Sequence, residues 1–312
     1  MTRPPVRPFL RPFARWLGQP LAALLLLAPL PACARQAAPA AAPKDADPAL
    51  WVVKDADTTI YLFGTIHVLK PGLSWFDEAV RAAFDRADEV KLEIVDLGAA
   101  EMGALVQAKG MLPANATLTA ALPAKERPAL AKYMGSIGLP RATYDRMQPW
   151  LAASYLQVQS LQKVGYDPAQ GPEQVITAAA KQAGKPLTGL ETVPEQIGFF
   201  AGLSDKAQVS MLAETLDEMP KLSREMGKMV DQWSAGKTDL IAKELNEGVA
   251  KTPEAMRVLL IDRNRRWADW IKARLDRPGT VFIAVGAGHL AGKASVQAEL
   301  ARRGVKTVRV VY

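Results

Sequence analysis

Cysteine and histidine are scarce in this chain of 312 residues, which has one cysteine and two histidines. A single cysteine excludes a disulfide within the chain. Long apolar runs are also lacking, because the run from Leu21 to Leu30 is too short to span a bilayer permanently. The net charge of +7 includes four arginines near the start, and no basic run is interleaved with aromatic residues, so we expect no nucleic acid partner.

Residues 1–34 have the features of an export signal. A basic stretch precedes the apolar run, and Leu30-Pro31-Ala32-Cys33 resembles a bacterial lipobox. We interpret Cys33 as a lipid attachment site that anchors the protein to a membrane, and simple secretion is the alternative because Ala32-Cys33-Ala34 also fits a signal-peptidase site. Both predict an exported protein of the bacterial cell envelope, in the periplasm or as an outer membrane lipoprotein. Residues 35–48, rich in Ala and Pro, predict a flexible or extended tether.

Residues 49–312 are expected to form one α/β domain. The pattern predicts a hairpin of strands 51–54 and 58–63, a helix over 75–86 with Ser74 as its N-cap, and a strand over 89–94. From about 99 to 275 it is mostly helical, with one buried strand predicted at 186–190. A strand at 281–285, a helix at 293–303 and a strand at 307–311 follow. Within the helical part, one core face is predicted from Met147, Trp150, Leu151, Tyr155, Val158 and Leu161.

Both histidines end the same four-residue pattern, and each pattern follows a strand-like apolar run. Gly64-Thr65-Ile66-His67 follows residues 59–63, and Gly286-Ala287-Gly288-His289 follows residues 281–285. Imidazole is the commonest metal ligand, and glycine lets the backbone approach a ligand closely. The alternative is that each histidine is an idle, hydrogen-bonded residue at a strand end. The duplication favours a shared site, which requires the first and last parts of the chain to lie side by side.

Two glutamates, Glu93 and Glu191, also fall at predicted strand ends. Ligands of open α/β sheets bind beyond the carboxyl ends of the strands, and two imidazoles with two carboxylates form a donor set for a divalent metal. Zinc would take two histidines, a carboxylate and water, whereas more oxygen ligands would suit manganese or cobalt. The alternatives are a solvated or salt-bridged role for Glu93 and helix N-terminal electrostatics for Glu191.

A predicted helix over 253–275 carries Arg263 and Asn264 in a gap of its apolar stripe. Polar groups on an inward face need partners. Arg263 could bind a substrate carboxylate or steady charge near the metal, because its guanidinium is a fixed fork of donors. The alternative is an internal salt bridge to Glu191 or Glu93.

These motifs, with Leu187-Thr188-Gly189-Leu190-Glu191-Thr192 and Val285 to Gly292, resemble the TraB/GumN family over 51–312. The resemblance implies a divalent-metal-dependent hydrolase related to the Tiki proteins, which are membrane-tethered proteases. Its GumN branch is associated with bacterial polysaccharide gene clusters. It also implies a mixed sheet flanked by helices with a long helical insertion, shared distantly with erythromycin esterases and haem-binding lipoproteins (EreA/ChaN-like). By the same resemblance, the motif positions correspond to His67, His289, Glu191, the pair Arg263-Asn264 and an acidic position at Glu93.

The sequence therefore predicts an exported, lipid-anchored metallohydrolase that acts on a peptide or another acyl substrate. His67 and His289 would bind the metal and its water, with Glu191 as ligand or general base and Glu93 as a further ligand. Arg263 and Asn264 would complete the catalytic set, with Arg263 holding negative charge. One alternative is a non-catalytic envelope lipoprotein that binds haem or scaffolds an export complex. Another is a metal-free hydrolase in which one histidine is the general base.

Overall fold

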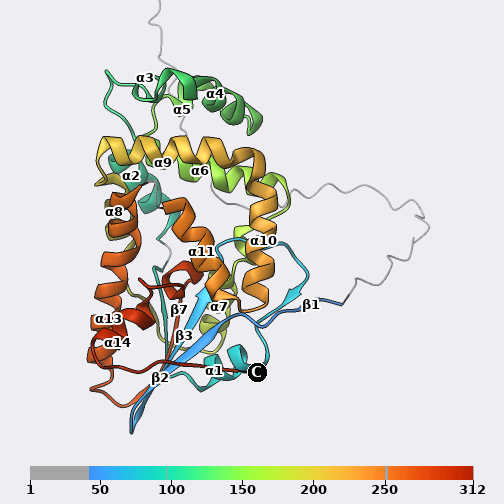
Figure 1. Ribbon diagram of the computed structural model, residues 1–312, viewed down its shortest axis with the longest axis vertical. Coiled ribbons are helices and arrows are strands. Elements are labelled where there is room, and N and C mark those ends of the chain that lie inside the picture. The colour runs from blue at the N-terminus through green and yellow to red at the C-terminus, as the bar shows by residue number, and fades with distance from the viewer. Residues whose placement is uncertain (1–41, 96, 250–251, 312) are drawn as a thin grey trace, which may run out of the picture.

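The structure is a computed structural model that describes residues 42–95, 97–249 and 252–311. Within these residues a mixed sheet of six strands has the order β6-β5-β7-β3-β2-β8 and is flanked by helices (Figure 1). Its strands are β2 (Leu50–Lys54), β3 (Thr58–Thr65), β5 (Glu89–Leu92), β6 (Leu187–Gly189), β7 (Gly279–Gly286) and β8 (Val308–Arg309). The predicted α/β class and mixed sheet are confirmed.

The first and last long strands, β3 and β7, lie side by side. They pair in parallel over their whole length, from Thr58 opposite Gly279 to Thr65 opposite Gly286. On the other side of β7, β5 pairs in parallel with it, and β6 pairs in parallel with β5. The carboxyl ends of these four parallel strands therefore lie at the same end of the sheet. This confirms that both histidine motifs begin side by side. β2 and β8 extend the sheet in antiparallel fashion.

The central strands are buried on both faces, as their β-branched and aromatic composition favours. On one face, Phe63 and Phe282 pack with Trp233. On the other, Ile283 packs in a cluster with Trp267. Each fully buried side chain of this size contributes about 1.5–3 kcal/mol. The two packed faces hold the strand ends in place.

Most helices lie between β5 and β7 in the chain, as the predicted helical insertion requires. Figure 1 shows α6 and α9 lying across one end of the molecule, with α3, α4 and α5 beyond them. The helices are α1 (Glu78–Arg86), α2 (Ala99–Lys109), α3 (Leu118–Ala121), α4 (Arg127–Ser136), α5 (Arg141–Tyr144), α6 (Pro149–Lys163), α7 (Pro172–Gln182), α8 (Val193–Ala201), α9 (Asp205–Glu218), α10 (Leu222–Ser234), α11 (Thr238–Val249), α12 (Pro253–Met256), α13 (Asp262–Arg274) and α14 (Val296–Arg302). In the described parts of the chain, no helix has the length and apolar composition needed to cross a membrane.

The buried face of α6 agrees only in part with the predicted one, since Trp150 and Leu161 are buried as predicted. Tyr155 and Val158 are 37% and 38% exposed, whereas Ala152, Ala153 and Leu156 are fully buried. The helix α9 packs against this alanine face, and the small side chains let the two helices approach closely. The apolar periodicity gave too much weight to the large residues.

Two predicted elements also differ from the structure. The helix α1 begins at Glu78 instead of Trp75, because Ser74 belongs to β4 (Leu73–Ser74), which pairs with β1 (Lys44–Asp45). Trp75 instead stacks on Phe63 in the core, with ring centroids 5.5 Å apart. The strand β6 was predicted to be buried but is a half-exposed edge strand, since it pairs on one side only.

The predicted export signal, including Cys33, lies outside the described residues. Part of the predicted tether is packed on the domain. The backbone N–H of Lys44 donates to Gly72 O at 2.8 Å, that of Asp47 donates to Ser234 O at 2.7 Å, and Ala46 is buried. Residues 44–47 of the segment assigned to the tether therefore belong to the packed domain.

Candidate functional site

Four predicted site residues follow the carboxyl ends of the four parallel strands. His67 follows β3, Glu93 follows β5 and Glu191 follows β6, while His289 lies in the short 3₁₀ helix η5 (Ala287–Leu290) after β7. Because these strands end at one edge, their loops meet there. The helix α13 brings Arg263 and Asn264, which are both buried, to the same edge.

Gly286 marks the place where both imidazoles and Glu93 converge. A Cβ atom on Gly286 would lie 3.1 Å from Glu93 Oε1, 3.7 Å from His289 Cδ2 and 3.9 Å from His67 Nε2. A side chain here would fill the space between them, and glycine leaves it open. We call His67, Glu93, His289 and Arg263 the polar centre.

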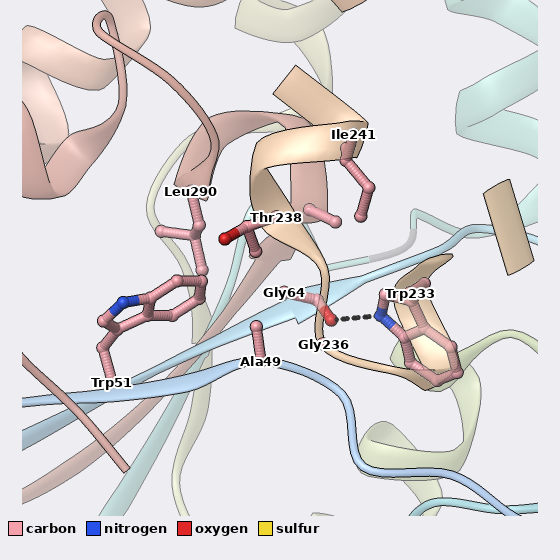
Figure 2. A pocket seen from close by; sticks show the side chains of 9 residues that line it. Ala49, Trp51, Gly64, Trp233, Gly236, Thr238, Ile241 and Leu290 are labelled. Atoms are coloured by element: carbon pink, nitrogen blue, oxygen red, sulfur yellow. Dashed lines mark hydrogen bonds between the residues drawn. The ribbon is translucent and has the colours of Figure 1, made fainter. Parts of the chain in front are cut away.

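Close packing positions the start of the first histidine motif. A Cβ atom on Gly64 would lie 3.2 Å from Ala287 Cα. Glycine at this position therefore lets the backbones of the two histidine motifs pack closely together. The indole N–H of Trp233 donates to Gly64 O at 2.7 Å (Figure 2). Figure 2 shows Trp51 and Leu290 on the other side of Gly64, and the space that these residues enclose is too small for a water molecule. This packing fixes where the backbone leaves β3.

A half-buried carboxylate from α7, Glu173, holds His67. The Nδ1–H of His67 donates to Glu173 Oε1 at 2.8 Å, and the hydroxyl of Thr65 donates to the same oxygen at 2.5 Å. The surrounding protein disfavours a charged ring, but the hydrogen bond to Glu173 and the charges of Glu173 and Glu93 outweigh it and raise the pKa of His67 to about 9. The side chain of His67 is 73% exposed, so water screens part of this effect and a ligand can reach the ring.

His289 is buried and neutral. The amide Nδ2 of Asn264 donates to Ala294 O at 2.6 Å, which turns Asn264 Oδ1 towards His289 Nδ1, also at 2.6 Å. The ring therefore carries its hydrogen on Nδ1 and has a lone pair on Nε2. This lone pair accepts from Arg263 Nη1 at 3.1 Å. Burial lowers the pKa of His289 to about 3, and the charge of Arg263 adds to this effect.

Glu93 lies between the guanidinium and the two imidazoles. Its Oε2 accepts from Arg263 Nη2 at 2.8 Å and from Gln196 Nε2 at 3.2 Å. Its Oε1 accepts from the backbone N–H of Gly286 at 2.7 Å and lies 3.6 Å from His289 Nε2. Burial raises the pKa of Glu93, but the neighbouring charges and the Gly286 N–H outweigh burial and lower it to about 2. Glu93 is therefore an anion whose Oε1 faces the imidazoles.

Arg263 binds both buried carboxylates. Its Nε donates to both oxygens of Glu191 at 3.0 Å, and its Nη2 lies 2.8 Å from Glu191 Oε2 and from Glu93 Oε2. Glu191 Oε1 also accepts from Trp267 Nε1 at 3.1 Å and from Arg266 Nη2 at 3.3 Å. The internal ion pair that the sequence left open as an alternative is present, and donors from α13 occupy both oxygens of Glu191.

The donors of the polar centre fit a divalent metal in type. The Nδ1 atoms of His67 and His289 are anchored by Glu173 and Asn264, and such partners characteristically orient metal-binding histidines. Their Nε2 atoms and Glu93 Oε1 remain as candidate ligand atoms. Over the described residues, no three His, Cys, Asp or Glu side chains stand close enough together to hold an ion as arranged. Binding would require Arg263 Nη1 to move away from His289 Nε2.

Glu173 is the site residue that sequence reasoning missed. It lies 106 positions from His67, in the first turn of α7 after Gly171 and Pro172. A carboxylate in a first helical turn is favoured by the helix dipole alone, so it did not stand out. The one related feature in the sequence is Gly171, two residues before Glu173. In the structure a Cβ atom on Gly171 would lie 2.4 Å from His67 O, so glycine is needed where α7 approaches the first motif. Gln196 and Arg266, which bind the two buried carboxylates, were also missed.

Comparison with known proteins supplies a family and uncharacterized relatives. Residues 49–309 match the model of the TraB/PrgY/gumN family. The uncharacterized protein YbaP of Escherichia coli K12 is 25% identical over 253 residues, which cover 80% of this chain and 90% of YbaP, and YbaP of Shigella flexneri gives the same values. An uncharacterized protein of Treponema pallidum is 22% identical over 262 residues, covering 79% of this chain and 78% of the relative. No solved structure matches.

Proposed function

Because this chain belongs to the TraB/PrgY/gumN family, we propose from its polar centre that it is a divalent-metal-dependent hydrolase of peptide or other acyl bonds. One observation carries the proposal. Two imidazoles from neighbouring parallel strands are each tied down through Nδ1, and both rings and an ionised carboxylate face the space beside Gly286. Two histidines and one carboxylate form a common catalytic metal site.

The ligands would be His67 Nε2, His289 Nε2 and Glu93 Oε1, with zinc, manganese or cobalt as the ion. When bound, the ion would lower the pKa of a water ligand towards about 7 and polarise the scissile carbonyl. Glu173 and Asn264 hold the hydrogens on Nδ1, so Nε2 is the atom of each ring that would bind the metal. Because His67 is protonated at neutral pH, metal uptake there releases its Nε2 proton to solvent.

Arg263 keeps one donor atom for substrate in this proposal. Its Nε and Nη2 bind carboxylates, whereas its Nη1 contacts only Leu259 O and His289 Nε2 among the described residues. We assign Nη1 to negative charge that develops on the substrate oxygen. Glu191, whose oxygens are filled, is a positioning residue for Arg263 instead of the ligand or general base expected from sequence. Asn264 orients His289.

The pair of His67 and Glu173 supports a second candidate, a metal-free hydrolase with His67 as general base. The half-buried carboxylate of Glu173 on Nδ1 orients the ring, and the exposed ring can reach a water molecule. The raised pKa of His67 means that the neutral, basic form accumulates only in alkaline solution. This candidate therefore predicts activity that survives chelation and rises towards pH 9, whereas the metal-dependent enzyme loses activity on chelation.

Elemental analysis and a peptide-library assay on the full protein test the proposal. We expect bound metal and activity in the wild type, loss of both in His67→Ala and Glu93→Gln, and recovery of wild-type activity after chelation and re-metallation. Glu89→Gln is a matched control for Glu93→Gln, because Glu89 begins β5, the strand that Glu93 follows, and pairs at 2.9 Å with Arg274, another arginine of α13. Equal metal content in wild type and both site variants would contradict the proposal. A Soret band in the purified protein would support the haem-binding alternative.

We also propose that Cys33 carries the lipid and anchors the protein in the cell envelope. The lipobox-like Leu30-Pro31-Ala32-Cys33 after an apolar run supports this. Labelled fatty acid should enter the wild-type protein but not Cys33→Ser, and both should be exported. A secreted, unlabelled wild type would show that only the signal peptide acts.

A further inference from the structure

An open groove of about 1000 Å³ lies beside the loop that follows His289. The helices α11, α13 and α14, the segment from α12 to the π-helical turn η4 (Arg257–Ile261), and residues 292–294 line it. Its cationic residues are Lys243, Arg265, Lys293 and Arg302, and apolar side chains come from Met256 and Ile261. The groove thus combines several positive charges with an apolar surface.

One of the two acidic residues that line the groove is already paired with arginines. Glu299 is buried, and its carboxylate accepts from Arg302 and from Arg303, while Arg265 lies 3.7 Å away. Asp239 is the other acidic lining residue and is exposed.

Two lysines of the groove are exposed to solvent. Lys243 and Lys293 are exposed, and neither amino group has an ion pair or hydrogen bond to any described residue. The groove therefore presents positive charge to an incoming ligand.

The groove is linked to the polar centre through two hydrogen bonds. Ala294, which lines the groove, accepts from Asn264 Nδ2, and Asn264 Oδ1 accepts from His289 Nδ1–H, both at 2.6 Å. A ligand in the groove therefore contacts the loop whose carbonyl orients Asn264 and, through it, the imidazole.

We propose that this groove binds an acidic, partly apolar segment of the substrate polypeptide and thereby holds the substrate beside the polar centre. The inference rests on the proposed function and gives its substrate class. Lys243 and Lys293 attract the carboxylates, which complement the groove in charge. Met256 and Ile261 receive the apolar side chains. An acidic polysaccharide, which has no such side chains, would leave the apolar surface uncovered.

Fluorescence anisotropy with a labelled peptide of alternating glutamate and leucine tests this proposal on the full protein. We expect binding that weakens with added salt and that is lost when glutamine replaces glutamate in the peptide. The double variant Lys243→Glu/Lys293→Glu should bind at least roughly tenfold more weakly. The double variant Lys132→Glu/Lys206→Glu, with two exposed lysines of α4 and α9 that do not line the groove, should bind as the wild type does. Circular dichroism establishes that each variant is folded.

Equal affinity in both double variants would overturn the groove assignment, as would binding of labelled polygalacturonate with no binding of the peptide. The variant His67→Ala separates this inference from the proposed function, because His67 does not line the groove. Suppose that peptide binding depends on the two lysines and survives in His67→Ala, but the wild type holds no metal and hydrolyses nothing. This result supports the groove assignment and contradicts only the enzyme proposal. Metal-dependent hydrolysis that is indifferent to the two lysines removes only the groove.

Discussion

The two histidines should titrate far apart in the metal-free protein, although an unperturbed histidine titrates near pH 6.5. We expect His67 to lose its proton near pH 9 and His289 to stay neutral down to about pH 3. Glu173→Gln removes the carboxylate that accepts from His67 Nδ1. The pKa of His67 should then fall towards 6.5, while that of His289 stays low.

These opposite shifts change the free energy of unfolding in different pH windows. The folded-state pKa of His289 lies below its unfolded value, so its contribution is fully present above pH 6.5. It falls by about 1.4 kcal/mol for each pH unit as the pH drops from 6.5 towards 3. The pKa of His67 is raised, so its contribution is fully present below pH 6.5 and is lost between 6.5 and 9. Since His67 is 73% exposed, this second loss should be much shallower.

Nuclear magnetic resonance can follow both rings directly, because an untagged chain contributes only two imidazoles. Long-range proton–nitrogen spectra give the protonation and the tautomer of each ring as the pH is varied. The control is Glu225→Gln, which removes a carboxylate on the surface of α10. Urea unfolding of the same samples measures the pH dependence of stability.

Two results would refute this reasoning. If both rings titrated near pH 6.5, the contacts with Glu173 and Arg263 would not exist in solution. If the neutral ring of His289 carried its hydrogen on Nε2, then the orientation of Asn264 and the ligand atom that we assign would both be wrong.

Further predictions concern stability. Arg263→Met removes the guanidinium shared by two buried carboxylates and should lower the free energy of unfolding by about 3–5 kcal/mol. Arg274→Met should cost less, because the carboxylate that pairs with Arg274 is 28% exposed. Equal losses in urea unfolding would contradict this. Trp233→Phe removes the donor to the Gly64 carbonyl and should cost about 1–3 kcal/mol by thermal unfolding, and an unchanged stability would contradict this. Burial raises the pKa of Asp145, but hydrogen bonds from Thr119 and Arg141 outweigh it and lower the pKa. The stability advantage of wild type over Asp145→Asn should therefore be present above pH ~3.9 and vanish at lower pH, and a pH-independent difference would count against it.

Local patterns predicted the six strands of the main sheet but not β1 and β4, and the duplicated G-x-x-H pattern favoured a shared site for the two histidines. The runs before Gly64 and Gly286 are apolar and β-branched, and such runs form central parallel strands whose ends share one edge. The burial of Arg263 and Asn264 was also predictable, since both interrupt an apolar helical stripe.

Partners chosen by tertiary packing could not be predicted in the same way. Glu173 reaches His67 only because α7 docks on the first motif loop, and a carboxylate in a first helical turn has a local explanation. Whether Arg263 binds substrate or pairs with Glu191 and Glu93 depends on distances in the folded protein, and the spacing of residues in the sequence does not give these distances. Tyr155 and Val158 were wrongly assigned to the buried face of α6, because α9 packs against the alanines, which a count of large apolar residues does not favour.

The parallel pairing of β3 with β7 has a consequence for how the molecule is made. One strand is near the beginning of the domain and its neighbour is near the end, so the ladder closes a loop that contains nearly all the helices. Such long-range contacts give a high contact order, and a ribosome has synthesised almost the entire chain before this closure is possible. Helices in between can form early from local contacts. A prematurely terminated chain that lacks β7 also lacks His289, so His67 has no second imidazole beside it. Loss of the final tenth of the polypeptide should therefore abolish the centre completely instead of weakening it.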